Sequence, residues 1–379
     1  MLLTDEQEQL RAATRRFAQR EIVQQAAEWD RNGGAPISVL RAMGELGLMG
    51  LCVDPAWGGA GADFLSYALA VEEIAAGDCG LCNMMCVNNS PNCAAIVDHG
   101  TPDQKERFLR PLAMGVQSSA FLLTEPHAGS DAAALLTQAV RTGEGYRLNG
   151  TKQFITAGRS ADVALIVAVT DPAAGKRGMS CFLAPTATPG YQVAKEEKKL
   201  GQRTADTCQI VLENMELPAE NLLGAPGDGY RIALAYLENG RIGVAAQAIG
   251  VARAAFEAAL RYAQTRETFG RTIIEHQAIA GRLADMATAI EAARQLTWHA
   301  AALKDAEHPC LKEASMAKLA ATEMAERVCS QALQIYGGNG YLNDYPVEKY
   351  YRDARVLSIY EGTNDIQRMV IGRALAGGR

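Results

Sequence analysis

The feature that most constrains the fold is a stretch of helical periodicity after Gly229 that is much longer than an average helix. The pattern predicts helices over residues 229–266, 275–306 and 310–336. Apolar side chains recur along them at the spacing of one helix face. Two such stripes are Ile242, Ala246, Ile249, Phe256 and Leu260, and Leu283, Met286, Ile290 and Ala293. Because the many alanines permit close approach of helices, we expect a four-helix bundle, which could also be buried between subunits.

The N-terminal part of the chain has shorter helical patterns separated by turns. Thr4 and Thr101 each precede a glutamine by three residues, the capping-box spacing that begins a helix. The glycine-rich segment 57–61 predicts a loop. The other predicted helices cover residues 37–46, 63–76 and 80–98.

Between about residues 116 and 225 the pattern changes to that of strands. Val163–Val169 is a short apolar run rich in β-branched residues, and Thr207–Leu212 resembles another strand. Asn149-Gly150 is typical of a hairpin turn, so we expect the segments on either side of it to pair. These signals predict a separate β domain.

The order of patterns defines an α+β fold class with three domains. We place an N-terminal helical domain at 1–115, a β-barrel or β-sandwich domain at 116–226, and a C-terminal four-helix bundle at 227–379. Strands and helices do not alternate, and no Gly-x-Gly-x-x-Gly lies at a strand–helix junction, which argues against a Rossmann domain. Motifs of serine hydrolases, zinc proteases and nucleotide triphosphatases are also missing.

Composition limits the partners and the compartment. A formal net charge of −6 with interleaved charges provides no basic stripe for nucleic acid. No apolar run suggests a membrane span, and the acidic start of the chain lacks a targeting pattern, so we expect a cytoplasmic protein. Nine cysteines indicate reduced thiols. Cys79, Cys82 and Cys86 cluster at helical spacing without a nearby histidine, which favours core packing over a metal site.

The segment Ile359–Ile366 contains the candidate catalytic group, Glu361. The glycine that follows this acid lets the main chain approach a ligand, and Thr363 can bind the same ligand or cap a helix. Taken alone, the same residues are also typical of a turn that begins a helix over 365–375.

Several segments together resemble the signatures of the acyl-CoA dehydrogenase family, nearly from end to end of the chain. The matching segments are Phe121–Asp131, Gln334–Tyr341 with Asp344, Lys349 and Asp353, Tyr360–Thr363, Arg266–Gly270, His276-Gln277 and the loop 57–61. Two residues depart from the family pattern: Leu122 replaces a small residue, and Phe154 replaces a tryptophan that many members have beside the flavin. Phe154 keeps the aromatic face on which a flavin can pack.

The resemblance implies that FAD binds between the β domain and the bundle, with a neighbouring subunit covering its adenosine half. No metal is implied. The implied contacts within the β domain are Phe121, Leu123, Thr124, Gly129, Ser130, Phe154 and Thr156. Residues implied to reach the FAD of a partner subunit are Arg266, Thr268, Gln334, Gly337 and Gly338, and further implied FAD contacts are Phe269, Gln277, Thr363, Asn364 and Asp365.

The resemblance also assigns the reaction, which converts an acyl-CoA to a trans-2-enoyl-CoA. Glu361 would remove the α proton while the β hydrogen leaves as hydride to FAD. We expect bound substrate to exclude water and raise the pKa of Glu361. Some members have the base one residue before Arg241; Gly240 occupies that position here, which sharpens the assignment to Glu361. Residues implied to bind the acyl-CoA are Ser130, Glu238, Arg241, Glu361 and Gly362. Outside this pattern, the i, i+3 pair of Glu238 and Arg241 would be an exposed ion pair.

The resemblance further implies a homotetramer, a dimer of dimers with FAD shared across subunits, that passes electrons to electron-transfer flavoprotein. Val87–Ser90 resembles short-chain members, so we expect short or medium acyl groups. The alternatives are an acyl-CoA oxidase, a nitroalkane oxidase or desulfinase, and a CoA-binding protein that has lost FAD. Oxygen uptake would identify an oxidase, and absence of flavin absorbance would identify the CoA-binding protein.

Overall fold

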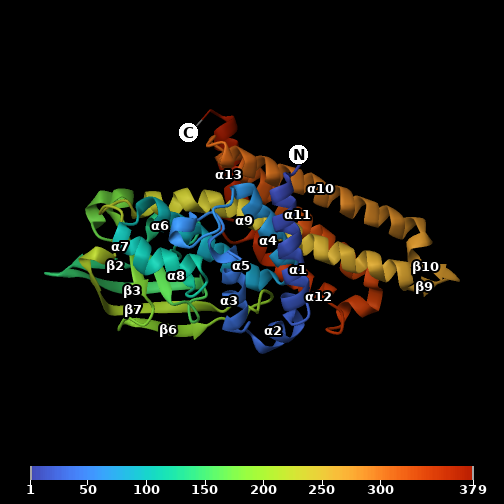
Figure 1. Cartoon of the computed structure of the whole chain (residues 1–379), viewed down its shortest axis with the longest axis horizontal. Helices are drawn as coiled ribbons and strands as arrows, with labels where there is room; N and C mark the ends of the chain where they lie inside the picture. Colours follow the sequence, from blue (N-terminus) through green and yellow to red (C-terminus); the bar gives the residue numbers. More distant parts are fainter. Residues whose placement is uncertain (1, 378–379) are drawn as a thin grey trace.

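The computed structural model describes residues 2–377. A helical N-terminal part, a sheet and a set of long helices follow one another along the chain (Figure 1). The sheet lies at one end of the molecule, and the hairpin between two long helices lies at the other. This arrangement confirms the α+β class and the predicted order of helices, strands and helices.

The N-terminal helices begin and end close to the predicted positions, with one exception. The capping boxes at Thr4 and Thr101 are both present. The single helix predicted over 80–98 is wrong, because Ser90 interrupts it with extended φ and ψ angles of −145° and 126°. Ser90 precedes Pro91, whose ring disfavours helical angles in the residue before it. The helices are α1 (Asp5–Phe17), α2 (Ala26–Asn32), α3 (Ile37–Glu45), α4 (Phe64–Gly77), α5 (Cys79–Val87), α6 (Ala94–His99), α7 (Pro102–Gln104) and α8 (Arg110–Ala113).

The strands of the middle part form a sheet in the order β6-β7-β3-β2-β4-β5-β8, with β1 parallel to β4. The strand predicted at Val163–Val169 is confirmed as β4, and its residues are buried from one end almost to the other. The strands are β1 (Ser119–Leu122), β2 (Gln138–Arg141), β3 (Gly145–Thr156), β4 (Val163–Val169), β5 (Met179–Pro185), β6 (Tyr191–Glu196), β7 (Thr207–Pro218) and β8 (Leu222–Leu223).

The hairpin predicted at Asn149-Gly150 is wrong, because both residues lie inside β3. The antiparallel partner of this part of β3 is β2, so the chain turns earlier, over 142–144. The absence of a side chain at Gly150 instead allows Thr137 to approach β3 closely. A Cβ on Gly150 would lie 2.7 Å from the Cα of Thr137. The pairing of β3 with β7 also shifts register at this point, as at a bulge.

The three long helices predicted after Gly229 are confirmed as α9, α10 and α11. α9 packs against α11 and α4, and its approach to α4 is close: a Cβ on Gly250 would lie 2.3 Å from the carbonyl oxygen of Glu72. By length and composition α9 could cross a membrane, but 89% of its most apolar window is buried inside the protein. The elements are α9 (Gly229–Thr265), β9 (Glu267–Thr268), β10 (Arg271–Thr272), α10 (Gln277–Asp305), α11 (Leu311–Tyr336), α12 (Val347–Ala354) and α13 (Asn364–Leu375).

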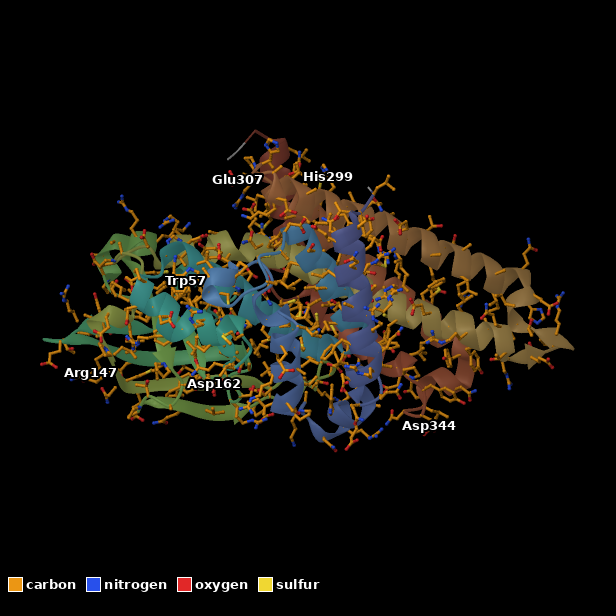
Figure 2. The ribbon with its side chains drawn as sticks, in the orientation of Figure 1. Trp57, Arg147, Asp162, His299, Glu307 and Asp344 are labelled. Carbon is orange, nitrogen blue, oxygen red and sulfur yellow. The ribbon has the colours of Figure 1, made fainter. Side chains whose placement is uncertain are left out.

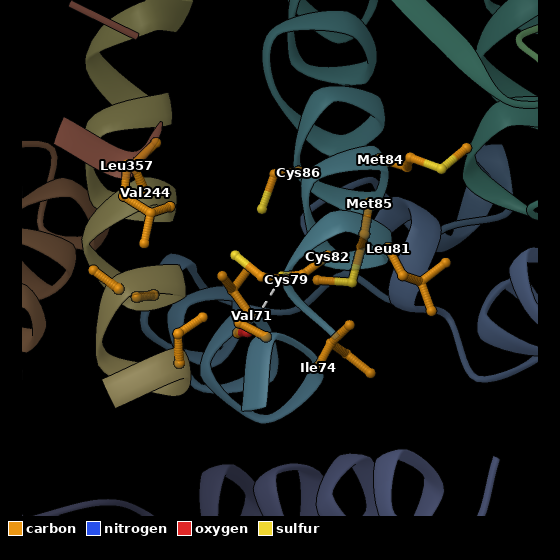
Figure 3. Close-up of a cluster of buried hydrophobic side chains, with 14 of the residues drawn as sticks. Val71, Ile74, Cys79, Leu81, Cys82, Met84, Met85, Cys86, Val244 and Leu357 are labelled. Atoms are coloured by element: carbon orange, nitrogen blue, oxygen red, sulfur yellow. Dashed lines mark hydrogen bonds between the residues drawn. The ribbon is translucent and has the colours of Figure 1, made fainter. Parts of the chain in front are cut away.

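The cysteines of α5 pack in the core between α4 and α9 (Figure 3). Cys79, Cys82 and Cys86 are buried, and the Cys82 thiol donates a hydrogen bond to the carbonyl oxygen of Val71 at 3.4 Å. Val244 of α9 lies on the other side of the cluster. The predicted packing role is confirmed. Within residues 2–377, no group of three or more His, Cys, Asp or Glu side chains is placed to hold a metal ion.

A buried ion cluster joins the three parts of the chain. Lys349 Nζ of α12 lies 2.8 Å from Asp78 Oδ2, at the start of α5, and 2.6 Å from Asp353 Oδ2. From the loop before β7, the Thr204 hydroxyl donates to Asp78 at 2.9 Å, and the Gln202 N–H donates to Asp353. Burial lowers the pKa of Lys349, but the charges of Asp353 and Asp78 raise it by more, so the pKa lies well above its usual value.

We expect Lys349→Met to lower the free energy of unfolding by about 3–5 kcal/mol, because it leaves two buried carboxylates without a counter-charge. Thermal unfolding followed by circular dichroism measures this change. Lys195→Met is the matched control, since the Lys195 side chain is 60% exposed in its ion pair. Equal melting temperatures for the two variants would show that the cluster does not hold the parts together.

Candidate active site

The segment before α13 has an unusual backbone at the candidate base. Glu361 has φ +52° and Gly362 has φ +90°, both in the left-handed region. Such angles are rare for a residue with a side chain and often mark functional sites. The Thr363 hydroxyl accepts a hydrogen bond from the N–H of Ile366 at 3.3 Å and caps α13. The turn that begins a helix is therefore present, and it also sets the direction of the Glu361 side chain.

The Glu361 carboxylate packs against α9 at the point where α9 has no side chain. A Cβ on Gly240 would lie 1.7 Å from Glu361 Oε2. Glu361 as a whole is partly buried, but its Oε2 is shielded from solvent and has no hydrogen-bond partner among residues 2–377. An acceptor that is buried and unpartnered in this way is free to receive a proton from a bound molecule.

The surroundings of Glu361 shift its acidity. Burial raises the pKa of the carboxyl to about 7, and the charges of Lys318 and Arg241 act in the opposite direction. A base needs a pKa close to the working pH, so that it is ionised yet still holds a proton well. The protein alone therefore raises the pKa of Glu361, before any substrate excludes water.

Two residues near Glu361 are not found by sequence motifs. The Tyr67 hydroxyl of α4 lies 2.9 Å from the position of a Cβ on Gly243, one turn along α9 from Gly240. Burial raises the pKa of Tyr67, as do Cys86 and Glu361. Lys318 of α11 is fully buried. A lysine on the alanine-rich face of a predicted core helix is the signal that could have identified Lys318.

The two charged residues of α9 implied to bind CoA, Glu238 and Arg241, have other partners and form no ion pair with each other within residues 2–377. Glu238 accepts a hydrogen bond from the Cys310 thiol at 3.5 Å. Arg241 Nη1 donates to the Ser315 hydroxyl at 3.3 Å, and Arg241 Nε is buried with no hydrogen-bond partner in the described part of the chain. Both thus line the junction of α9 with the start of α11, and Arg241 keeps a free donor for an anion or carbonyl.

In the sheet, a buried ion pair fixes the first group of residues implied to contact FAD. Lys152 Nζ lies 2.9 Å from Glu125 Oε1 and donates to the carbonyl oxygens of Leu123, at 3.0 Å, and Val167, at 2.8 Å. The N–H of the next residue on β3 donates to the Thr124 carbonyl at 2.9 Å. The signature segment after β1 is therefore held rigidly against β3.

The chemistry of this first group fits a flavin. Phe154 is 65% exposed although it is aromatic, and its backbone is left-handed with φ +59°. Its ring thus offers an open face for a planar ring system. Thr124 and Thr156 are partly exposed hydroxyls, and Asn83 holds the second of them with a hydrogen bond of 3.3 Å. Of the remaining members, Gly129 and Ser130 are exposed, Phe121 is half-buried and Leu123 is buried.

A second group implied to contact FAD lies around the hairpin between α9 and α10, at the end of the molecule away from the sheet (Figure 1). Arg266 and Thr268 lie in the hairpin between α9 and α10, and Phe269 at its tip is 96% exposed. The end of α11 packs beside this hairpin, since Tyr336 stacks on Tyr262 with ring centroids 4.1 Å apart. The other members are Gln277, Gln334, Gly337 and Gly338.

The two groups lie on different parts of the fold: the first lies on and after the strands β1 and β3, and the second lies around the hairpin between α9 and α10 (Figure 1). In Figure 2, Arg147 of β3 marks the sheet end, and Asp344, beyond α11, lies toward the hairpin end.

Thr363, Asn364 and Asp365 line a third location, a cavity of about 730 Å³ between α10, α11 and α13. A second cavity of about 640 Å³ continues from it toward Gln277. Both include Ala289 and Arg327, so together they form a groove along α10 and α11. The groove connects the third location with the hairpin end.

Comparisons with known proteins show similarity over almost the whole chain. Family models described as the N-terminal, middle and C-terminal domains of acyl-CoA dehydrogenase match residues 4–116, 120–215 and 227–376. The chain is 46% identical to "Acyl-CoA dehydrogenase" of Bacillus subtilis over 100% of both chains. It is 45% identical to "Short-chain specific acyl-CoA dehydrogenase, mitochondrial" of Rattus norvegicus, over 97% of this chain and 90% of that protein. Among solved structures, butyryl-CoA dehydrogenase from Megasphaera elsdenii is similar with a TM-score of 0.97 and 41% identity, over 99% of both chains.

The raised pKa of Glu361 predicts how stability depends on pH. Between about pH 4.5 and pH 7 the unfolded chain ionises this group while the folded protein keeps it protonated, so stability falls as pH rises through that window. Glu361→Gln removes this loss of stability. For a pKa raised from 4.5 to about 7, the loss corresponds to roughly 3 kcal/mol.

Melting temperatures of the wild type and of Glu361→Gln at about pH 5 and about pH 8 test this linkage. The variant should gain stability over the wild type at the higher pH. Glu144→Gln, in the exposed turn before β3, is the control and should show no such gain. A difference that is the same at both pH values would contradict a buried, weakly acidic Glu361.

Proposed function

This chain belongs to the acyl-CoA dehydrogenase family, and we propose that it oxidises the Cα–Cβ bond of short acyl-CoA thioesters, with Glu361 as the base. The family consists of FAD-dependent oxidoreductases that act on CH–CH groups. The observation that supports the base most strongly is the shielded, unpartnered Oε2 of Glu361 above Gly240. The relatives named for short-chain and butyryl substrates support the choice of short acyl groups.

Glu361 takes the proton in the proposed reaction. Its carboxylate removes the α proton of the thioester, and the electron pair of that C–H bond becomes the new double bond as the β hydrogen leaves with its own pair. FAD, when bound, supplies the acceptor for this β hydride. The raised pKa of Glu361 suits it to hold the proton after the transfer. The products are a trans-2-enoyl-CoA and a protonated Glu361.

The thioester carbonyl needs donors, because negative charge develops on its oxygen as the α proton leaves. Within residues 2–377 the main-chain N–H of Glu361 donates to no protein group, so it is available for this oxygen. Gly362, with its left-handed backbone and no side chain, leaves room for the thioester beside this N–H. We assign Ser130, Glu238 and Arg241 to the CoA portion of the substrate.

Two copies of the chain would complete each FAD site. The group around Phe154 would hold the flavin ring, and the hairpin group with Arg266 of the partner would hold the rest of the molecule. The groove along α10 and α11, lined by Thr363, Asn364 and Asp365, extends this surface. A homotetramer built as a dimer of dimers, electron-transfer flavoprotein as acceptor and a cytoplasmic location form part of this proposal. The domain boundaries after residues 115 and 226 stay predictions.

We expect Glu361→Gln to retain FAD and to lower the rate of flavin reduction by butyryl-CoA about 10²–10⁴-fold, because the amide cannot accept the α proton. Anaerobic stopped-flow absorbance measures the rate, and thermal unfolding shows that the variant is folded. Rapid bleaching of the variant would rule out Glu361 as the base. Rapid oxygen uptake by the wild type with butyryl-CoA would instead indicate an oxidase.

Gly240→Ala tests the space that Glu361 requires. The new methyl would lie 1.7 Å from Glu361 Oε2 and must displace it. We expect a loss of roughly 10²-fold in the rate of flavin reduction, since a shift of about 1 Å in a catalytic group has this effect. Stability should be kept, because alanine favours a helix over glycine by about 1 kcal/mol. Gly372→Ala on α13 is the control, because a Cβ at this position would have no described atom of another part of the chain within 4 Å. Equal rates for both variants would contradict the proposed position of the base.

A further inference from the structure

Lys318 is a buried cation that contacts the turn carrying Glu361. It lies in the middle of α11 and has no exposed surface. Its Nζ donates hydrogen bonds to the carbonyl oxygen of Gly362 and to Asn364 Oδ1, both at 3.0 Å. A buried lysine with two specific acceptors from the candidate catalytic segment is unusual, since lysines are almost never fully buried unless paired.

Other side chains complete the hold on this turn. The Thr322 hydroxyl, one turn further along α11, donates to the same Asn364 Oδ1 at 3.1 Å. Gln367 Nε2 donates to the carbonyl oxygens of Gly362, at 2.8 Å, and Glu361, at 3.3 Å. These bonds fix both carbonyls of the left-handed pair, a conformation that the Glu361 backbone would otherwise leave.

Lys318 also determines much of the charge around the carboxylate. The groups that face Glu361 are Lys318 from α11, Arg241 from α9 and the Tyr67 hydroxyl from α4. Of the two cations, Lys318 exerts the larger effect on Glu361. Burial lowers the pKa of Lys318 to about 8, while Glu361 raises it and Arg241 lowers it, and Glu326 adds to the rise. Lys318 is therefore still charged at neutral pH.

We propose that Lys318 is a positioning residue for Glu361: its hydrogen bonds hold the left-handed turn that directs the carboxylate at Gly240, and its charge allows that carboxylate to be ionised at neutral pH. The proposal rests on the proposed role of Glu361 as the base. Lys318 acts through Glu361 and needs no contact with substrate or FAD.

Two substitutions separate the charge from the hydrogen bonds. Lys318→Gln removes the charge but keeps an N–H donor, whereas Lys318→Met removes both. Lys312→Gln is the matched control, because Lys312 lies on the same helix with its side chain 40% exposed and pairs with Glu313.

The first readout is the pH profile of flavin reduction by butyryl-CoA in the holoenzyme. The rate rises with pH as Glu361 ionises, and we expect Lys318→Gln to move this rising limb up by about one pH unit. Lys318→Met should show the same displacement and a limiting rate lower by about tenfold or more. The control should coincide with the wild type. A slower Lys318→Gln variant whose limb stays in place would overturn the proposal, since a merely structural lysine would give that result.

The second readout does not depend on catalysis. We expect Glu361→Gln to raise the melting temperature at about pH 8 by roughly 2 °C more in the Lys318→Met background than in the wild type, because the ionised carboxylate has then lost the cation with the larger effect on it. Equal gains in the two backgrounds would show that no charge coupling exists. If none of the acyl-CoAs tested bleaches the flavin of the wild type, the proposed function fails. The double-mutant cycle still decides whether Lys318 and Glu361 are coupled.

Discussion

The position of the candidate base depends on the buried ion cluster of Asp78, Lys349 and Asp353. These groups come from the N-terminal helices and from α12, and the loop before β7 donates to both carboxylates. Asp353 lies in the last turn of α12, shortly before the segment with Glu361. Between them, the Tyr360 hydroxyl donates to Gln247 of α9 at 2.8 Å. The cluster therefore joins the three parts of the chain and sets the approach of the catalytic turn to α9.

Much of the fold could be predicted because it depends on local signals. Helix α9, expected over 229–266, spans Gly229–Thr265, since its length follows from periodicity and its ends from turn residues. The errors arise where distant contacts override a local preference. Asn149-Gly150 has the sequence of a turn, but the glycine allows the close approach of Thr137, which immediately precedes β2. The break at Ser90 had a local cause in the proline that follows it, which the helical pattern concealed.

The site divides in the same way. Glu361 could be proposed as the base because Tyr360–Thr363 resembles the catalytic segment of the family, and the empty position at Gly240 supported that choice. The sequence could not show that these two positions meet, nor that Lys318 and Tyr67 lie beside them, because the contacts join α4, α9, α11 and the turn before α13. Glu238 and Arg241 share a helix face as expected, but both turn to α11 instead of to each other. The residues implied to contact FAD lie in three places, on the sheet, around the α9–α10 hairpin and at the start of α13, and only the fold reveals this separation.

The central feature is a carboxylate held against a glycine, whose buried Oε2 has no hydrogen-bond partner among the described residues, in a chain whose family oxidises acyl thioesters. The most direct measurement is an anaerobic titration of the purified yellow protein with butyryl-CoA, followed by visible absorbance and by mass spectrometry of the thioester. The account predicts that flavin colour disappears in proportion to added thioester and that a product two hydrogens lighter forms in equal amount. A flavin-loaded protein that keeps its colour and leaves butyryl-CoA and other acyl-CoAs unchanged would contradict it.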